Sequence, residues 1–160
     1  MDTIAVITQK GVNEAPSKTR NSARAVVVDT SGRIPMMHVK NLGFHKLPGG
    51  GIDAGETAIE AVLREVREET GCEVAIEGEI GRVLEVRSDK EQVSFCYHGR
   101  VLSKGESQLT QKERRQGFSV VWVTIDEAIS LIRADGNCKW ATTVREREIA
   151  ILTHARESLS

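Results

Sequence analysis

The stretch from Gly50 to Cys72 concentrates residue types that could bind a divalent metal ion. It contains an isolated glutamate and then a charged cluster: Glu56, followed by Arg64, Glu65, Glu68 and Glu69. At about 100° per residue, the last three glutamates fall within roughly 100° of one helix face. Such like charges repel by about 0.2–0.5 kcal/mol a pair, whereas Mg²⁺ or Mn²⁺ takes carboxylate oxygens as ligands. Taken alone, the acidic run fits a solvated helix face better.

The loop before this stretch favours the metal site. Leu47–Gly51 reads Leu-Pro-Gly-Gly-Gly, and consecutive glycines allow a backbone to approach a ligand closely. Glycine carbonyls can coordinate a cation, and glycine amides can face phosphate oxygens. An ordinary turn into a helix is the alternative for the loop alone. Together with Glu56 and the acidic face, the loop indicates a metal and phosphate site.

One helix must position the carboxylates, and its limits are marked in the sequence. Thr57 and Glu60 form a capping-box pattern, and Gly71 suits a left-handed helix end. An apolar arc beside the acidic face is expected to anchor the helix to a core, through Ile59, Val62, Leu63 and Val66.

The Gly50–Cys72 stretch resembles the Nudix box, G-x5-E-x7-R-E-U-x-E-E-x-G-U with U a bulky aliphatic residue. Every specified position matches except the last, where Cys72 replaces Ile, Leu or Val. A free cysteine behaves as a small hydrophobe, so this departure is mild. The resemblance implies an α/β sandwich with a mixed sheet and a loop–helix–loop motif. It also implies a hydrolase that cleaves nucleoside diphosphates linked to another group.

The resemblance assigns roles to the box residues. It implies a Mg²⁺ or Mn²⁺ cofactor held by Glu65, Glu68, Glu69 and the carbonyl of Gly49. Arg64 would hold the catalytic carboxylates by ion pairing, and Glu56 and Gly50 would support the site. The reaction would be attack of water on one phosphorus of a diphosphate linkage.

The general base has two candidate positions. Some Nudix hydrolases use the glutamate at the Glu65 position, and others use a glutamate from a distant loop. The polar segment Gly105–Gly117 is suited to be such a loop, with Glu113 as the first candidate and Glu106 as the second. A solvated charge cluster is the alternative for this segment.

The substrate follows less directly from the sequence. Nudix subfamilies differ about fifteen to eighteen positions after the box, where the ADP-ribose type has proline and the dinucleoside polyphosphate type tyrosine. The corresponding residues here match neither: Arg87, Ser88, Asp89 and Lys90. We therefore predict a MutT-like pyrophosphohydrolase of nucleoside triphosphates. The alternatives are a nucleotide-sugar or ADP-ribose-type pyrophosphatase and a non-catalytic nucleotide-binding module, which the intact box glutamates disfavour.

Two residues beside the glycine loop are candidates for contacting the substrate, namely Phe44 and His45. Aromatic rings could stack on a base, and the aromatic candidates are few: Phe44, Phe95, Tyr97, Phe118, Trp122 and Trp140.

Composition limits the remaining possibilities. A chain of 160 residues predicts one domain, with residues 1–22 as an N-terminal extension or edge strand. The net charge of −1 argues against nucleic-acid and membrane partners. The resemblance implies a small nucleotide as the partner. No secretory signal or membrane-spanning run is evident, which favours the cytoplasm. Three scattered cysteines predict separate thiols: Cys72, Cys96 and Cys138. The oligomeric state stays open.

The pattern outside the box predicts alternating strands and helices. Strands are expected at 4–7, 23–29, 34–40, 73–76, 80–87, 93–102 and 118–123. Further helices are expected at about 124–133 and 144–157. Helices packed on both faces of such strands would give the α/β sandwich.

Overall fold

The computed structural model describes residues 1–12, 15–88, 90–136 and 141–159, so Asp89, Cys138 and Trp140 lie outside the described residues. Its strands are β1 (Thr3–Thr8), β2 (Lys18–Val28), β3 (Ile34–Val39), β4 (Phe44–Lys46), β5 (Gly49–Gly51), β6 (Glu73–Arg87), β7 (Lys90–Ser103) and β8 (Phe118–Val123). Its helices are α1 (Ala58–Thr70), α2 (Gln111–Gln116), α3 (Ile125–Ala134) and α4 (Ala141–Leu159), with a 3₁₀ turn at Lys40–Leu42. None of the helices within this described part is long and apolar enough to cross a membrane.

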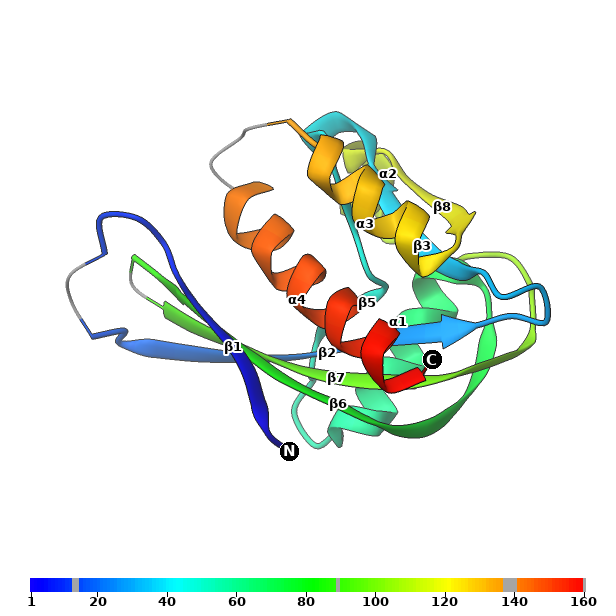
Figure 1. Cartoon of the computed structure of the whole chain (residues 1–160), viewed down its shortest axis with the longest axis horizontal. Helices are drawn as coiled ribbons and strands as arrows, with labels where there is room; N and C mark the ends of the chain where they lie inside the picture. The colour runs from blue at the N-terminus through cyan, green and yellow to red at the C-terminus, as the bar shows by residue number, and fades with distance from the viewer. Residues whose placement is uncertain (13–14, 89, 137–140, 160) are drawn as a thin grey trace.

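The strands form two sheets. The larger has the order β1-β6-β7-β2-β5, and the smaller has the order β4-β3-β8. In the larger sheet β1 runs parallel to β6 and β2 runs parallel to β7, whereas β6 and β7 are antiparallel. The sheet is therefore mixed. The glycine strand β5 lies at its edge, where it pairs only with β2 in the strand order (Figure 1).

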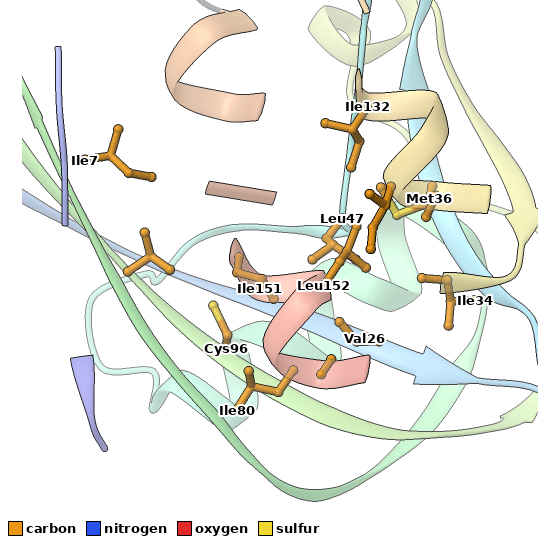
Figure 2. Packing of buried hydrophobic residues seen from close by; sticks show 14 residues of the cluster. Ile7, Val26, Ile34, Met36, Leu47, Ile80, Cys96, Ile132, Ile151 and Leu152 are labelled. Atoms are coloured by element: carbon orange, nitrogen blue, oxygen red, sulfur yellow. The ribbon is translucent and has the colours of Figure 1, made fainter. Parts of the chain in front are cut away.

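The two faces of the larger sheet carry separate cores because side chains alternate along each strand. On β2, Ala23, Ala25 and Val27 pack with Val62 and Val66 of α1. The opposite face packs against α4 (Figure 2), through Val26, Cys96, Ile151 and Leu152, and α3 joins the same core beside α4. Fully burying one such aliphatic side chain contributes about 1.5–3 kcal/mol. The two cores hold α1 and α4 on opposite sides of the sheet.

The caps that the sequence predicts for α1 are present. Thr57 Oγ1 accepts from the Glu60 amide (3.1 Å), and Gly71 adopts φ 77° while its amide donates to Arg67 O (2.8 Å). The predicted apolar arc was partly wrong. Ile59 is 44% exposed, and the small Ala61 is fully buried in its place against the sheet.

Two other predicted elements differ from the structure. The segments 73–76 and 80–87 form one strand, β6, which keeps its pairing with β7 through irregularities between Ile76 and Gly78 and between Glu79 and Gly81. The segment expected to be a loop, Gly105–Gly117, contains the helix α2. Thr110 and Glu113 close a capping box there, which satisfies the first backbone amides of a short helix. Both predicted thiols that the structure describes, Cys72 and Cys96, are buried and unpaired.

Candidate active site

A cavity of about 340 Å³ opens beside the glycine strand β5, and residues from α1, α2 and α4 also line it. This volume is in the range of small-molecule sites. Its cationic lining residues are Arg20, Arg24, Lys46, Arg87, Lys112 and Arg147, and its acidic lining residues are Glu65, Glu69 and Glu113. Cations therefore outnumber carboxylates two to one on its walls, although the chain as a whole carries a net charge of −1.

Strand β5 lets the charged groups approach because it has no side chains. A Cβ at Gly50 would lie 2.7 Å from Glu65 Oε1, and a Cβ at Gly49 would lie 2.8 Å from Arg24 Cα. Real Cβ atoms do not approach other atoms this closely. The amide of Gly49 also donates to Glu69 Oε1 at 2.7 Å. The glycine-rich loop is therefore an edge strand that packs directly against carboxylates of α1.

Glu69 is the most buried carboxylate of the cavity, with 1% of its surface exposed. Burial raises the pKa of Glu69, and the positive charge of Lys46 opposes this rise. The Lys46 Nζ donates to Glu69 Oε2 and to the carbonyl oxygen of Gly49, both at 3.1 Å. One ammonium group thus bridges two oxygens that the sequence predicts as metal ligands.

Arg64 links the box carboxylates and the glycine strand. Its Nε and Nη2 donate to the two carboxylate oxygens of Glu56, at 2.7 and 2.9 Å. Its Nη1 donates to Glu65 (3.0 Å) and Glu68 (3.3 Å), and its Nη2 also donates to Gly51 O (3.0 Å). The bidentate hydrogen bonds lower the pKa of Glu56 to about 2. The pKa of Glu65 is raised, first by burial and then by the charge of Glu69.

The donor groups at this end of the cavity match the chemistry of a hard divalent cation. Carboxylate and carbonyl oxygens are the ligands that Mg²⁺ prefers, and an ammonium cation already contacts Gly49 O and Glu69. Within residues 1–12, 15–88, 90–136 and 141–159, no three acidic, histidine or cysteine side chains are gathered as a metal-binding group. Glu68 instead turns toward Arg64, and its side chain is 34% exposed. These oxygens suit a divalent cation, and Lys46 contacts two of them, Gly49 O and Glu69 Oε2.

Glu113 lies at the cavity although it is not in a loop. It occupies the first turn of α2, where its Oε1 accepts from the Thr110 amide (2.9 Å). It lines the same cavity as Glu65 and Glu69, and its charge contributes to the raised pKa of Glu69. Glu106 is exposed and is not among the residues that line the cavity.

Strand alternation separates the two predicted substrate contacts. Phe44 and Lys46 of β4 both line the cavity, whereas His45 between them points to the other side. The His45 ring stacks on His38 at 4.3 Å, and its Nδ1 lies 2.8 Å from Asp135 Oδ1. The prediction that His45 approaches a substrate does not agree with this placement. Among the other aromatic candidates, Phe118 also lines the cavity.

Sequence reasoning missed most of the cationic wall. Lys46 could have been found from its alternation with Phe44 on a short strand. Arg20 and Arg24 are four residues apart and share one side of β2, and Arg24 stands between alanines in an otherwise apolar run. An arginine in such a run is a signal, since buried charges are rare unless they are paired or functional. Arg147 gave no such signal, because it stands in the charged run from Arg145 to Glu148.

Comparisons with known proteins agree with this architecture. The family model described as NUDIX domain matches residues 18–142. A Bacillus subtilis (strain 168) protein named "Putative 8-oxo-dGTP diphosphatase" is 37% identical over 73 residues, which are 46% of this chain and 49% of that protein. An RNA pyrophosphohydrolase of Erythrobacter litoralis (strain HTCC2594) is 50% identical over 44 residues, 28% of this chain and 27% of that protein. The matches thus span about half and about a quarter of these curated relatives.

Solved structures show the same fold. The crystal structure of a MutT protein from Methanosarcina mazei Go1 superposes with a TM-score of 0.64 at 19% identity, covering 92% of this chain and 100% of that chain. The α/β fold class expected from the resemblance is confirmed, with its mixed sheet and the helix α1 that follows the glycine strand. Since the family model covers most of the chain, the protein belongs to the NUDIX domain family.

Proposed function

We propose that the protein is a metal-dependent hydrolase that cleaves a phosphoric anhydride bond in a nucleotide. The observation that carries this proposal is the placement of Glu65, Glu69 and the Gly49 carbonyl at one end of a cavity with mainly cationic walls. The carboxylate end suits a divalent cation, and the cationic walls suit the phosphates of a ligand. A neutral ligand would leave the charges of Arg20 and Arg24 without a counter-charge from the described residues, since Lys46, Arg87 and Arg147 already pair with glutamates.

The residues that would hold the cation are Glu65, Glu68, Glu69 and the carbonyl of Gly49. When bound there, Mg²⁺ or Mn²⁺ supplies charge neutralisation to the phosphate oxygens and lowers the pKa of a water ligand. Lys46 must leave its contacts with Glu69 and Gly49 for these oxygens to become available. Arg64 keeps Glu56 and Glu65 fixed through its hydrogen bonds and is a positioning residue.

Glu65 is the general base that the geometry favours. It lies against Gly50 at the cavity wall, and Arg64 engages its Oε1. Glu113 lines the same cavity, but one of its oxygens accepts from the Thr110 amide as part of a helix cap. We assign Glu113 a supporting role toward the substrate or its cation, and we assign proton removal from the attacking water to Glu65.

A nucleoside triphosphate is the substrate class that the cationic walls favour, and Phe44 or Phe118 can stack on the base. The relative named as an 8-oxo-dGTP diphosphatase supports this choice. Pyrophosphatase activity on nucleotide sugars or ADP-ribose is the second candidate, since the same carboxylates would serve a two-phosphate linkage. In either case the reaction adds water across a P–O–P bond and gives two phosphate products.

A hydrolysis screen tests the proposal. The protein is incubated with dNTPs, oxidised dNTPs, ADP-ribose, nucleotide sugars and a 5′-triphosphorylated RNA oligonucleotide, and nucleoside monophosphates, phosphate and pyrophosphate are measured. Turnover of at least one small nucleotide is expected with Mg²⁺ or Mn²⁺, and its loss is expected in EDTA. Full turnover in metal-free buffer contradicts the metal mechanism. Turnover of the RNA alone contradicts the small-nucleotide substrate.

A further inference from the structure

The cavity has a second charged region on the side of the sheet that faces α4. Four arginines line it: Arg20 and Arg24 from β2, Arg87 from the end of β6, and Arg147 from α4. We call these residues the arginine wall. The proposed function uses the cationic walls for phosphates in general, and it does not assign a particular phosphate to the arginine wall.

Two fully buried glutamates balance only part of this positive charge. Glu85 accepts from Arg87 Nη2 (2.7 Å) and from Arg147 Nη1 (2.9 Å). Glu148 lies 3.3 Å from Arg147 Nε and also accepts from the Leu47 amide (2.8 Å). Both carboxylates are thus engaged by Arg147, and Glu85 is shared with Arg87. Four guanidinium groups face two carboxylates, which leaves the arginine wall with excess positive charge.

The excess charge lies mainly on β2. Arg24 is buried, and its Nε donates to the neutral hydroxyl of Ser94 at 3.1 Å. Within the part of the chain that the structure describes, neither Arg20 nor Arg24 has a carboxylate at ion-pair distance. Burial and the charge of Arg147 lower the pKa of Arg24. A buried, charged Arg24 is costly for the fold unless an opposite charge compensates it. An anion bound in the cavity would supply that opposite charge.

The arginine wall and the carboxylates flank the same strand. A Cβ at Gly51 would lie 3.2 Å from Arg20 Nη2, and a Cβ at Gly49 would lie 2.8 Å from Arg24 Cγ. A Cβ at Gly50, the residue between them, would meet Glu65 instead. Because β5 has no side chains, one phosphate chain lying along it can reach the carboxylates and the arginines together.

We propose that Arg20, Arg24 and Arg87 form a subsite for an additional phosphate of the substrate, so that the protein selects nucleotides with three or more linked phosphates. This inference rests on the proposed function and names the residues that would select its substrate class. Guanidinium groups bind phosphate bidentately and remain charged, which makes arginine suited to this task. A nucleotide sugar or ADP-ribose would place an uncharged sugar against the arginine wall and leave its charge uncompensated.

Binding of inorganic tripolyphosphate to the metal-free protein tests the subsite directly. Titration calorimetry in EDTA compares the wild-type protein with Arg20→Gln and Arg87→Gln. In both variants Glu85 keeps Arg147 as a partner. Arg100→Gln is the matched control, because Arg100 lies on β7, is 64% exposed and pairs with Glu77 outside the cavity. We expect about tenfold weaker binding in each cavity variant and wild-type binding in the control. No binding by the wild type, unchanged binding in both cavity variants, or equal loss in the control overturns the proposal.

Kinetics provide the second readout. We expect Arg87→Gln to raise the KM for the preferred nucleoside triphosphate about tenfold while kcat and the KM for ADP-ribose stay near wild type. An equal rise in KM for both substrates overturns the subsite, because a general loss of the site would affect both. If the wild-type protein hydrolyses no nucleotide, the proposed function fails, whereas the tripolyphosphate titration still decides the subsite.

Discussion

Lys46 and Glu69 form a buried ion pair in which the Lys46 Nζ lies 3.1 Å from Glu69 Oε2, with only 13% and 1% of the two side chains exposed. The same ammonium also donates to Gly49 O. The pair joins the helix α1 to the end of strand β4 through charge. It also means that a cation entering this site competes with a lysine that is already there.

Replacing Lys46 by methionine is therefore expected to have opposite effects with and without metal. In EDTA the variant leaves Glu69 buried without its cation, and removing one partner of a buried pair costs about 3–5 kcal/mol. With Mn²⁺ or Mg²⁺ present, the stability should return and metal affinity should exceed that of the wild type. Thermal unfolding with and without metal, together with a metal titration, measures both effects. A Tm in EDTA equal to that of the wild type would show that the pair contributes nothing.

The two glutamate candidates for the base can be separated by kinetics. Glu65→Gln is expected to lower kcat by about 10²–10⁴-fold, the range of general-base assistance. Glu113→Gln should lower kcat by less than about tenfold and should mainly loosen the first turn of α2, where Glu113 completes a cap. Circular dichroism checks that both variants fold. The reverse order of the two kcat losses would move the base from α1 to α2.

Gly50→Ala tests the close approach between β5 and α1. The new Cβ would lie 2.7 Å from Glu65 Oε1, so the end of the Glu65 side chain must move away from the cavity wall. A displacement of about 1 Å at a reacting group can cost about 10²-fold in rate, so we expect this loss in a folded protein. Gly136→Ala is the control, because a Cβ there meets nothing within 4 Å. Wild-type turnover by Gly50→Ala would show that Glu65 does not need its present position.

The pair between Arg64 and Glu56 predicts a defined pH dependence of stability. The hydrogen bonds from Arg64 lower the pKa of Glu56 from 4.5 to about 2. A carboxylate whose pKa is lowered in the folded state stabilises the fold above its unfolded pKa, and this contribution is lost as the pH falls toward the folded value. The free energy of unfolding of Glu56→Gln should therefore fall less than that of the wild type between about pH 4.5 and 2. Parallel curves for both proteins in urea titrations at several pH values would contradict the pairing.

Local chemistry explains what the sequence could predict. The ends of α1 follow from Thr57 and Gly71, and the grouping of Glu65 and Glu69 follows from the helical period, which depends on neighbouring residues alone. The arginine wall could not be assembled in this way. Arg147 meets Glu85 across 62 positions of sequence, because α4 packs on the sheet that contains β6.

The misplaced residues have equally physical reasons. His45 is next to the glycine loop in sequence, but pairing of β4 with β3 fixes which residues face the cavity, and it selects Phe44 and Lys46. Glu113 was predicted in a loop because the segment is polar. The capping box with Thr110 instead lets six polar residues form a helix without any buried side chain.

The glycine strand β5 lies between two groups of cavity residues, those proposed for bond cleavage and those proposed for substrate selection. The groups proposed for bond cleavage come from one short stretch between Lys46 and Glu69, whereas the arginine wall is assembled from β2, β6 and α4. Mutations at positions 20, 24 and 87 can therefore change which nucleotide is preferred while the cleavage chemistry is left intact. A library that randomises those three positions would offer a direct route to enzymes with the same reaction and different substrates.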